Sequence, residues 1–499
     1  MKLYQRRLSG ILVHPTCFPS PYGIGDLGQG AYDFIDFLSA GGQCLWQVLP
    51  LGPTSFGDSP YQSFSAFAGQ PLLISPDLLK EDGLLTQEDL SHIPEWKSKY
   101  VDYGWVLVYK TGLFQRAYDR FLSMEHTPLY SEYLSFCKEH QYWLSDYALF
   151  MTLKDLHKGC SWLEWEPEYR SLTEEHRLQL EKTMKKEIGY YRFLQFLFYR
   201  QWETLKTYAN ERGIAIIGDI PIFVSADSAD VWANKELFLL DTKGFPLCVA
   251  GVPPDYFSVT GQLWGNPLYD WDAHKREHYH WWISRIRHQL SLTDYLRIDH
   301  FRGFESCWSV PAGEKTAVNG TWVKGPGAEL FTAIQSALGE DLPILAEDLG
   351  VITPEVEALR DRFSFPGMKI LQFGFEGMGE SDFQPHNFTT PNCLCYTGTH
   401  DNDTSLGWFQ YIQPEPRKKL CKYLNCDGSE ISLDMIRLCL GSIARFALFP
   451  IQDLLQLDTQ ARMNTPGIPS GNWTFRYEQG DLTKELAQWL LEHTRLYGR

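Results

Sequence analysis

Residues 213–224, GIAIIGDIPIFV, hold the pattern that decides the fold: a short, β-rich apolar run that ends in polar, Gly or Pro residues. The same pattern recurs along the chain, with helical stretches between its occurrences. The other runs are CLWQVLPLGPT (44–54), PLLIS (71–75), DYLRIDHFRGF (294–304), LPILAEDLG (342–350), MKILQFGF (368–375), CLCYTGTHDND (393–403) and RFALFPIQD (445–453). Nearly continuous apolar strands of this kind are typical of parallel sheets that are buried on both faces.

Eight such strands separated by helices predict an α/β fold, a (β/α)₈ barrel that takes in the whole chain, 1–499, as one catalytic domain. The alternative is a doubly wound open sheet, which would carry a phosphate-binding glycine fingerprint after a strand. The candidate for that fingerprint, GIGDLGQG at 23–30, follows no strand of the right kind. We therefore interpret it as a turn and prefer the barrel.

The predicted strands are unevenly spaced. About 140 residues separate the second from the third, far more than one crossover helix needs. Residues 77–190 are rich in helix formers, and we expect them to form a helical subdomain inserted in the barrel. A second insertion, 225–290, contains GVPPDYFSVTGQLWGNPLYDW, which is dense in Gly, Pro and aromatic residues. We expect this insertion to form a small subdomain with an aromatic loop that acts as a lid over the active site.

The composition excludes several classes of protein. A net charge of −17 argues against nucleic acid or an anionic membrane as the partner, since both require a basic surface. No apolar run approaches the ~18 residues that a membrane span needs, and the N-terminal stretch lacks a signal-type hydrophobic segment. The 11 cysteines, an odd number scattered along the chain, are typical of free thiols in a reducing compartment. We therefore expect a cytoplasmic protein.

Two further features of composition bear on ligands. Cys393 and Cys395 share one face of a predicted buried strand, and the second ligand pair that a zinc site needs is missing, so we expect no metal there. Aromatic residues make up 15% of the chain, and most must fill the core. Many nevertheless lie in loops beside Gly, Pro, Asp and Asn, where flat faces with polar tips suit the surface of sugars.

Four predicted strands end on acidic residues: Asp219, Asp299, Glu347 and Asp401. In a barrel the carboxyl ends of the strands form the active-site face, so these four side chains would meet at one mouth. A single Asp at such a position is usually a helix cap or a turn former. Carboxylates that lie close together repel one another, which raises their pKa values. Such clusters occur mainly at functional sites, where the shifted pKa values serve catalysis.

Paired carboxylates suit the chemistry of glycosidic bonds, in which one attacks the anomeric carbon and the other protonates the leaving oxygen. Arg297 lies two residues before Asp299, so both point to the same face of the strand and the guanidinium would keep Asp299 ionised as a nucleophile. Glu347 is then the natural acid/base, although an ion pair with a neighbouring Arg or Lys is the alternative for it. Asp401 would accept hydrogen bonds from ring hydroxyls, with His400 donating to the same region.

Longer motifs carry a family resemblance. RIDHFRG (297–303), AEDLG (346–350) and THDN (399–402) resemble three signature regions of the α-amylase clan, and IIGDIPIFV (216–224) resembles a fourth. The remaining stretches are similar to the amylomaltases, also called 4-α-glucanotransferases or disproportionating enzymes, of glycoside hydrolase family 77. These stretches are HPTCFPSPYGIGDLG (14–28), WQVLPLGPTSFGDSPYQSFSAFAGQPLLIS (46–75), RMNTPG (462–467) and GNWTFR (471–476). The resemblance runs nearly end to end.

The resemblance implies a role for each matching residue. Asp299 falls on the family's nucleophile, Glu347 on its general acid/base and Asp401 on its transition-state stabiliser. Other residues match positions that support the reacting sugar or contact glucan elsewhere: Arg297, Asp219, His400, Tyr61, Asp255, Trp264 and Asn464. The implied mechanism requires no metal and no cofactor.

The implied reaction is the transfer of an α-1,4-glucan segment to the 4-hydroxyl of an acceptor glucose or maltooligosaccharide by a retaining double displacement. α-1,4-Glucans and maltooligosaccharides would then be both donor and acceptor. A hydrolytic α-glucosidase or amylase shares the acids and differs in the lid. A non-catalytic glycan-binding protein would be marked by a lost catalytic acid, and none is lost. We prefer a transferase because the aromatic lid can exclude water; the sequence leaves the oligomeric state open.

Overall fold

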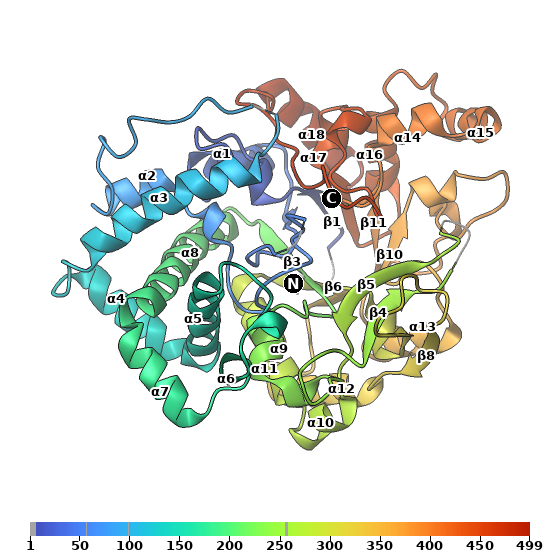
Figure 1. Ribbon diagram of the computed structural model, residues 1–499. Helices are drawn as coiled ribbons and strands as arrows, with labels where there is room; N and C mark the ends of the chain where they lie inside the picture. Colours follow the sequence, from blue (N-terminus) through green and yellow to red (C-terminus); the bar gives the residue numbers. More distant parts are fainter. Residues whose placement is uncertain (1–5, 56, 98, 255–257) are drawn as a thin grey trace.

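The computed structural model describes residues 6–55, 57–97, 99–254 and 258–499. Eight parallel strands form its centre, with helices around them (Figure 1). They are β1 (Leu8–Leu12), β2 (Leu45–Gln47), β3 (Ala215–Pro221), β6 (Tyr295–Asp299), β9 (Ile344–Ala346), β10 (Gly367–Ile370), β11 (Cys393–Tyr396) and β12 (Phe446–Pro450).

Strand order shows how the sheet closes. Neighbours run β10-β11-β12-β1-β2-β3-β6-β9, which is the order of the chain around a ring. The two ends of that series meet where the N–H of Ala346, on β9, donates to the carbonyl of Pro366 beside β10 at 2.9 Å. The sheet is thus a (β/α)₈ barrel, and the predicted fold class is confirmed.

Two apolar cores hold the barrel. Alternate strand residues fill its interior: Leu8, Leu45, Ile217, Tyr295, Leu345, Met368, Ile370, Leu394, Tyr396, Phe446 and Leu448. The opposite strand faces, with residues such as Ile11, Trp46 and Ile298, pack against the surrounding helices in a much larger core. Because both faces of the strands are buried, their sequences are nearly continuous in apolar residues.

One predicted strand, PLLIS at 71–75, is wrong. Pro71–Leu73 form a single 3₁₀ turn, η3, instead. The buried ammonium of Lys110 donates to the carbonyls of Leu72 at 2.7 Å and Ile74 at 3.0 Å, which are groups that a strand would offer to its neighbour. The local sequence is apolar enough for a strand, but a side chain from a distant helix satisfies its backbone.

The true first strand, β1, was missed by the sequence pattern. It reads LSGIL, and it pairs with β12 on one side and β2 on the other. Ser and Gly interrupt the apolar run, yet Gly10 is required by the packing. A Cβ at Gly10 would lie 2.1 Å from the carbonyl oxygen of Leu45, so no larger residue fits between these two strands.

The long connection from β2 to β3 is helical (Figure 1). Its helices are α2 (Pro76–Glu81), α3 (Tyr103–Phe121), α4 (Pro128–Glu139), α5 (Gln141–Leu156), α6 (Pro167–Arg170), α7 (Glu174–Thr183) and α8 (Lys185–Glu211). Helix α8 runs through residue 190 and leads into β3. The division of this region into an inserted subdomain at 77–190 stays a prediction.

The connections on either side of β6 share a second sheet. It consists of β4 (Cys248–Val252), β5 (Gln262–Pro267), β7 (Ser306–Pro311) and β8 (Thr321–Lys324), in the antiparallel order β5-β4-β7-β8. Helices α9 (Ala229–Ala233), α10 (Trp271–Arg276) and α11 (His280–Leu292) complete the segment between β3 and β6. The predicted insertion at 225–290 therefore contains a hairpin, β4–β5, and its action as a lid stays a prediction.

The other helices lie in the remaining connections of the barrel and at the C-terminal end of the chain. They are α1 (Gln29–Ala40), α12 (Ala328–Leu338), α13 (Pro354–Arg362), α14 (Ser405–Tyr411), α15 (Pro414–Leu424), α16 (Ile431–Gly441), α17 (Ile451–Leu454) and α18 (Lys484–Leu496). In the described part of the chain, no helix combines the length and apolar character needed to cross a bilayer. GIGDLGQG is a turn leading into α1, as predicted.

The contacts of Lys110 make a prediction about stability. Replacing Lys110 with Met keeps the apolar stem but leaves two buried carbonyls and the carboxylate of Asp26, 3.6 Å away, without their cation. We expect the free energy of unfolding to fall by about 3 kcal/mol in a denaturant titration. Lys80→Met, at a partly exposed lysine of α2, should change it far less. Equal effects of the two substitutions would contradict the assigned role of Lys110.

Candidate active site

The four predicted acids lie at one end of the barrel, three of them on or after the adjacent strands β3, β6 and β9. Asp219 lies in β3, Asp299 ends β6, Glu347 follows β9 and Asp401 lies in the loop after β11. Burial raises the pKa of Asp299; the Arg297 guanidinium opposes this rise, and the charges of Asp219 and Asp401 add to it. The acids therefore interact at one mouth, as the strand ends predicted.

Arg297 sits between two of these acids. Its Nη1 donates to Oδ2 of Asp219 at 2.6 Å and its Nη2 to Oδ1 of Asp299 at 2.8 Å. The hydroxyl of Tyr61 donates to the same Oδ2 of Asp219 at 2.8 Å. Arg297 and Asp219 are buried, whereas the side chain of Asp299 keeps 30% exposure and can meet a ligand. Charge-assisted bonds of this geometry fix the direction of the Asp299 carboxylate.

Glu347 has a different environment. Its Oε2 accepts the backbone N–H of His300 and its Oε1 that of Leu349, both at 2.7 Å. These bonds favour the ionised form, but burial and the nearby Asp299 carboxylate outweigh them and raise the pKa of Glu347 to about 8. His300 directs its N–H by adopting a left-handed conformation, φ 55° and ψ 48°.

The two carboxyls therefore hold unlike protonation states. Burial raises the pKa of both carboxyls, and the Asp299 charge raises that of Glu347 further. Arg297 hydrogen-bonds Asp299 directly, which favours the charge on Asp299 and the proton on Glu347. An ionised carboxylate beside a carboxylic acid is what nucleophilic attack and leaving-group protonation require.

Asp401 is held by the C-terminal part of the chain. The amide of Asn464 donates to Oδ1 of Asp401 at 2.6 Å, and Nε2 of His400 lies 3.4 Å from Oδ2. Arg462 donates to the backbone carbonyls of Asp401 at 2.6 Å and of Asn464 at 2.8 Å. The side chain of Asp401 is 46% exposed, so it can accept further hydrogen bonds from a ligand.

Aromatic rings line the same mouth. Tyr61 stacks on His400 with centroids 5.1 Å apart, and Trp473 lies within 6 Å of both rings. Trp264, on β5, meets the ring of His300 edge to face at 4.8 Å, beside the support of Glu347. A wall of this kind suits the apolar faces of sugar rings.

The structure thus brings together the predicted residues that it describes, and Asp255 lies outside the described residues. Sequence reasoning did not assign Arg462 or Trp473, although both lie in motifs quoted for the resemblance, RMNTPG and GNWTFR. Neither residue lies at the end of a predicted strand or at a telling distance from another site residue. The signal that could have found them was their position inside motifs that had no other explanation.

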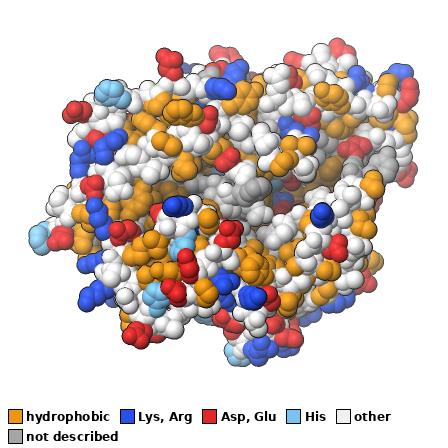
Figure 2. All heavy atoms as spheres, in the orientation of Figure 1, with side chains coloured by type: hydrophobic (Ala, Val, Ile, Leu, Met, Phe, Trp, Pro, Cys, Tyr) orange, Lys and Arg blue, Asp and Glu red, His pale blue; other side chains and the backbone are white. Residues whose placement is uncertain are grey.

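Other features of the chain bear on cofactors and partners. Among the described residues, no group of three or more His, Cys, Asp or Glu side chains is placed to hold a metal ion. Cys393 and Cys395 are buried in β11, and all 11 thiols are free. On the face shown in Figure 2, basic side chains are interspersed with acidic ones.

A barrel whose mouth holds an ionised and a protonated carboxyl is the arrangement of enzymes that act on glycosidic bonds. Comparison with known proteins is more specific. A sequence profile of the 4-alpha-glucanotransferase family matches residues 13–483. The chain is 50% identical over 499 residues to a 4-alpha-glucanotransferase of Synechocystis, covering 100% of this chain and 99% of that protein. It is 49% identical over 486 residues to one from Thermus thermophilus, covering 96% of each.

A solved structure agrees. The amylomaltase from Streptococcus agalactiae, determined in complex with acarbose, matches with a TM-score of 0.96 and 41% identity, covering 99% of this chain and 100% of that one. The chain belongs to the 4-alpha-glucanotransferase family. The predicted family and class of enzyme are thereby confirmed.

The protonation of Glu347 and Asp299 determines the expected pH dependence of catalysis. Because Glu347 must be protonated to act as an acid, and burial and Asp299 raise its pKa to about 8, kcat/KM should fall above about pH 8. Asp299 must be ionised, so an acid limb should lie above the ordinary range of an Asp, since burial raises its pKa. Initial rates across pH 4–10 check this, with circular dichroism confirming the fold. A profile that stays flat through pH 10 would remove Glu347 from the role of acid.

Proposed function

We propose that the enzyme transfers a segment of an α-1,4-glucan to the 4-hydroxyl of an acceptor glucose or maltooligosaccharide by a retaining double displacement. The observation that carries the proposal is the contrast between two neighbouring carboxyls, Asp299 bound by Arg297 and Glu347 with its raised pKa. The names of the relatives support 4-α-glucan chemistry. Donor and acceptor are then both α-glucans.

The reaction has two steps. Asp299 attacks the anomeric carbon of the donor while Glu347 protonates the 4-oxygen of the departing fragment, leaving a covalent glucosyl–enzyme. Glu347, now a base, removes the proton from the 4-hydroxyl of a second glucan. That oxygen attacks the anomeric carbon and releases Asp299, so two inversions restore the original configuration.

The other residues support the reacting sugar. Asp401, aimed by Asn464, accepts hydrogen bonds from ring hydroxyls as the sugar approaches an oxocarbenium ion. His400 donates to the same region, and Tyr61 stacks beside it. Asp219 holds Arg297, and through it the direction of the nucleophile. Asp255 and Trp264 contact glucan from the predicted lid.

Transfer requires that a sugar, not water, complete the reaction. Water is present at roughly 55 M and an acceptor at about a millimolar, so favouring the acceptor needs on the order of 10⁴–10⁵ in relative reactivity, about 6 kcal/mol. Acceptor binding and exclusion of water supply this. Trp264 is well placed for both, because it lies at the mouth against His300, whose N–H binds the acid/base Glu347.

The setting of the reaction follows from the same features. Eleven free cysteines suit a reducing compartment, and we place the enzyme in the cytoplasm, acting on maltodextrins in starch or glycogen metabolism. Hydrolytic action on the same glucans is the second candidate, because the acids alone would serve either reaction. The product pattern decides between them.

Incubation with maltotriose tests the proposal directly. Transfer predicts glucose together with longer maltooligosaccharides on a chromatogram, because one donor elongates another. Asp299→Asn should lower turnover by at least about 10⁴-fold, since the nucleophile is lost while the shape is kept. Thermal unfolding of the variant should match that of the parent. Products consisting only of shorter sugars would show hydrolysis, and full turnover by the variant would remove the mechanism.

A second substitution tests the exclusion of water. Trp264→Ala opens the mouth beside His300, and the ratio of hydrolysis to transfer should rise by about tenfold, which corresponds to about 1.4 kcal/mol in favour of water. Reducing-end release compared with chain elongation measures the ratio. Trp322→Ala is the matched control, because Trp322 lies in β8 at the far edge of the same sheet. A constant ratio in the Trp264 variant would contradict the role of this side chain.

A further inference from the structure

The loop at 397–405, TGTHDNDTS, carries two of the site residues, His400 and Asp401, between β11 and α14. Its first residue, Thr397, donates its backbone N–H to the carbonyl of Leu448 on β12 at 3.4 Å, and the residues beyond it depend on other contacts. Hydrogen bonds from outside reach its middle: Gln372 donates to the carbonyl of Asp403 at 2.9 Å, and Arg462 to that of Asp401. Its two ends are held differently.

Both ends of the loop bind one buried carboxylate. Asp453 lies in α17, directly after β12, and is fully buried. The hydroxyls of Thr397 and Ser405 donate to its Oδ2 at 2.6 and 2.7 Å, and the backbone N–H of Ser405 donates to its Oδ1 at 2.6 Å. Thr397 is the first residue after β11 and Ser405 the first of α14. One side chain thereby closes the loop at its base.

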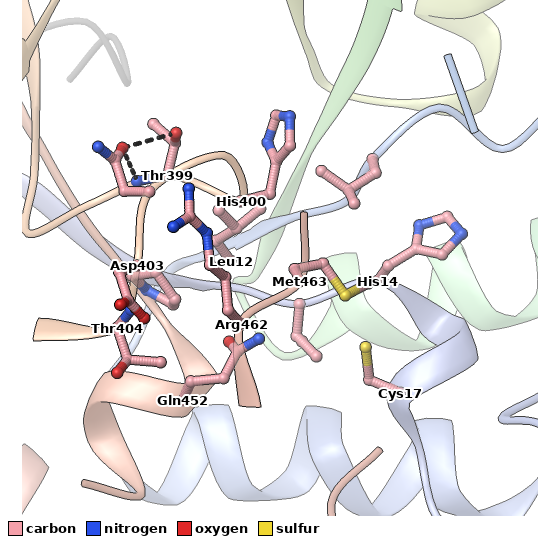
Figure 3. Close-up of a pocket in the computed structure, with 14 residues that line it drawn as sticks. Leu12, His14, Cys17, Thr399, His400, Asp403, Thr404, Gln452, Arg462 and Met463 are labelled. Atoms are coloured by element: carbon pink, nitrogen blue, oxygen red, sulfur yellow. Dashed lines mark hydrogen bonds between the residues drawn. The ribbon is translucent and has the colours of Figure 1, made fainter. Parts of the chain in front are cut away.

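The packing beneath the loop is incomplete. A cavity of about 20 Å³, enough for one water molecule, lies beneath His400 and Thr404. Figure 3 shows residues that line it: His400, Asp403 and Thr404 come from the loop, and Leu12, His14, Gln452 and Met463 come from other segments. Hydrogen bonds therefore define the position of the loop together with the packing of His400 against Tyr61 and Trp473.

Packing alone does not explain why a carboxylate, Asp453, is buried at this position. Burial disfavours the ionised carboxylate and raises the pKa of Asp453, while the bonds from Thr397 and Ser405 act against that rise. An apolar residue would fill the same volume without this cost. Asp453 does what an apolar residue cannot, because it fixes the distance between the two ends of the loop that carries Asp401.

We propose that Asp453 is a positioning residue for the transfer reaction, which fixes the loop at 397–405 and so holds Asp401 and His400 against the reacting sugar. Asn464 aims the Asp401 carboxylate within the loop, and Asp453 sets where the loop itself lies. The inference rests on the proposed role of Asp401 in stabilising the transition state. Asp453 touches no substrate and acts through the loop alone.

Substitutions at Asp453 test the inference. Asp453→Ala should lower kcat with maltotriose by about 30-fold and leave KM within about twofold, because Asp401 acts in the transition state rather than in substrate binding. Asp453→Asn should restore most of kcat, since its amide oxygen can accept the N–H of Ser405 and its amide nitrogen can donate to the two hydroxyls. Failure of the Asn variant to exceed the Ala variant contradicts the proposal.

A matched control lies at the opposite end of the barrel. Asp294 accepts the backbone N–H of Ile216 at 2.7 Å and the amide of Asn210 at 3.0 Å, just before β6. Asp294→Ala removes comparable bonds without touching the mouth, so kcat should stay within about twofold of the parent. An equal fall of kcat in the Asp294 and Asp453 variants would show a general loss of stability and overturn the inference.

A double-mutant cycle separates positioning from structure. If Asp453 acts through Asp401, Asp453→Ala should cost about 30-fold in the parent but less than about threefold in the Asp401→Asn background, measured with a glycosyl fluoride donor. Equal costs in both backgrounds would overturn the inference. Unchanged turnover in Asp401→Asn alone would contradict the role of Asp401 on which the inference rests, whereas release of only shorter sugars from maltotriose would contradict the proposed function, and so the two failures are distinguishable.

A milder variant covers the case in which Asp453→Ala does not fold. Thr397→Val keeps the shape of the side chain and removes one bond to Asp453, so kcat should fall by about fivefold while KM holds. The same cycle with Asp401→Asn then applies, and the effect of Thr397→Val should vanish in that background. An undiminished effect there, or no effect in the parent, overturns the inference.

Discussion

A buried guanidinium between two carboxylates is the interaction on which the active site depends. Arg297, on β6, binds Asp219 on the adjacent strand β3 and Asp299 on its own strand. Without it two acids would lie in a poorly hydrated mouth with no cation, and Asp299 would compete with Glu347 for the shared proton. With it, the charge is directed to Asp299 and the proton to Glu347. The different roles of Asp299 and Glu347 therefore follow from the position of Arg297.

The barrel supplies fixed strand ends, and distant segments complete the site around them. Tyr61 reaches Asp219 from the loop after β2, and Asn464 and Arg462 hold Asp401 from near the C-terminus. A closed parallel sheet makes this possible because every strand points the same way, and each following loop starts at the same rim. Side-chain hydrogen bonds, such as those of Asp453, then help to position the loops.

Prediction from sequence succeeded where a local pattern carries the information. Seven of the eight barrel strands show apolar runs long enough to recognise, but β1 is interrupted by Ser9 and Gly10. PLLIS shows the opposite failure, because its carbonyls are taken by Lys110 from another part of the chain. The acids at strand ends and the Arg297–Asp299 spacing were readable for the same reason, whereas Asp453 and Trp473 have no local signature.

The sequence by itself determined the barrel, the residues at its strand ends and the family, because strand periodicity and contiguous motifs are short-range properties of a chain. Only the tertiary structure decided that the N–H of His300, in a left-handed conformation, binds Glu347. It also decided which distant side chains aim Asp401. Hydrogen bonds between residues far apart in sequence leave no periodic trace, since a single donor and acceptor suffice and any loop can bring them together.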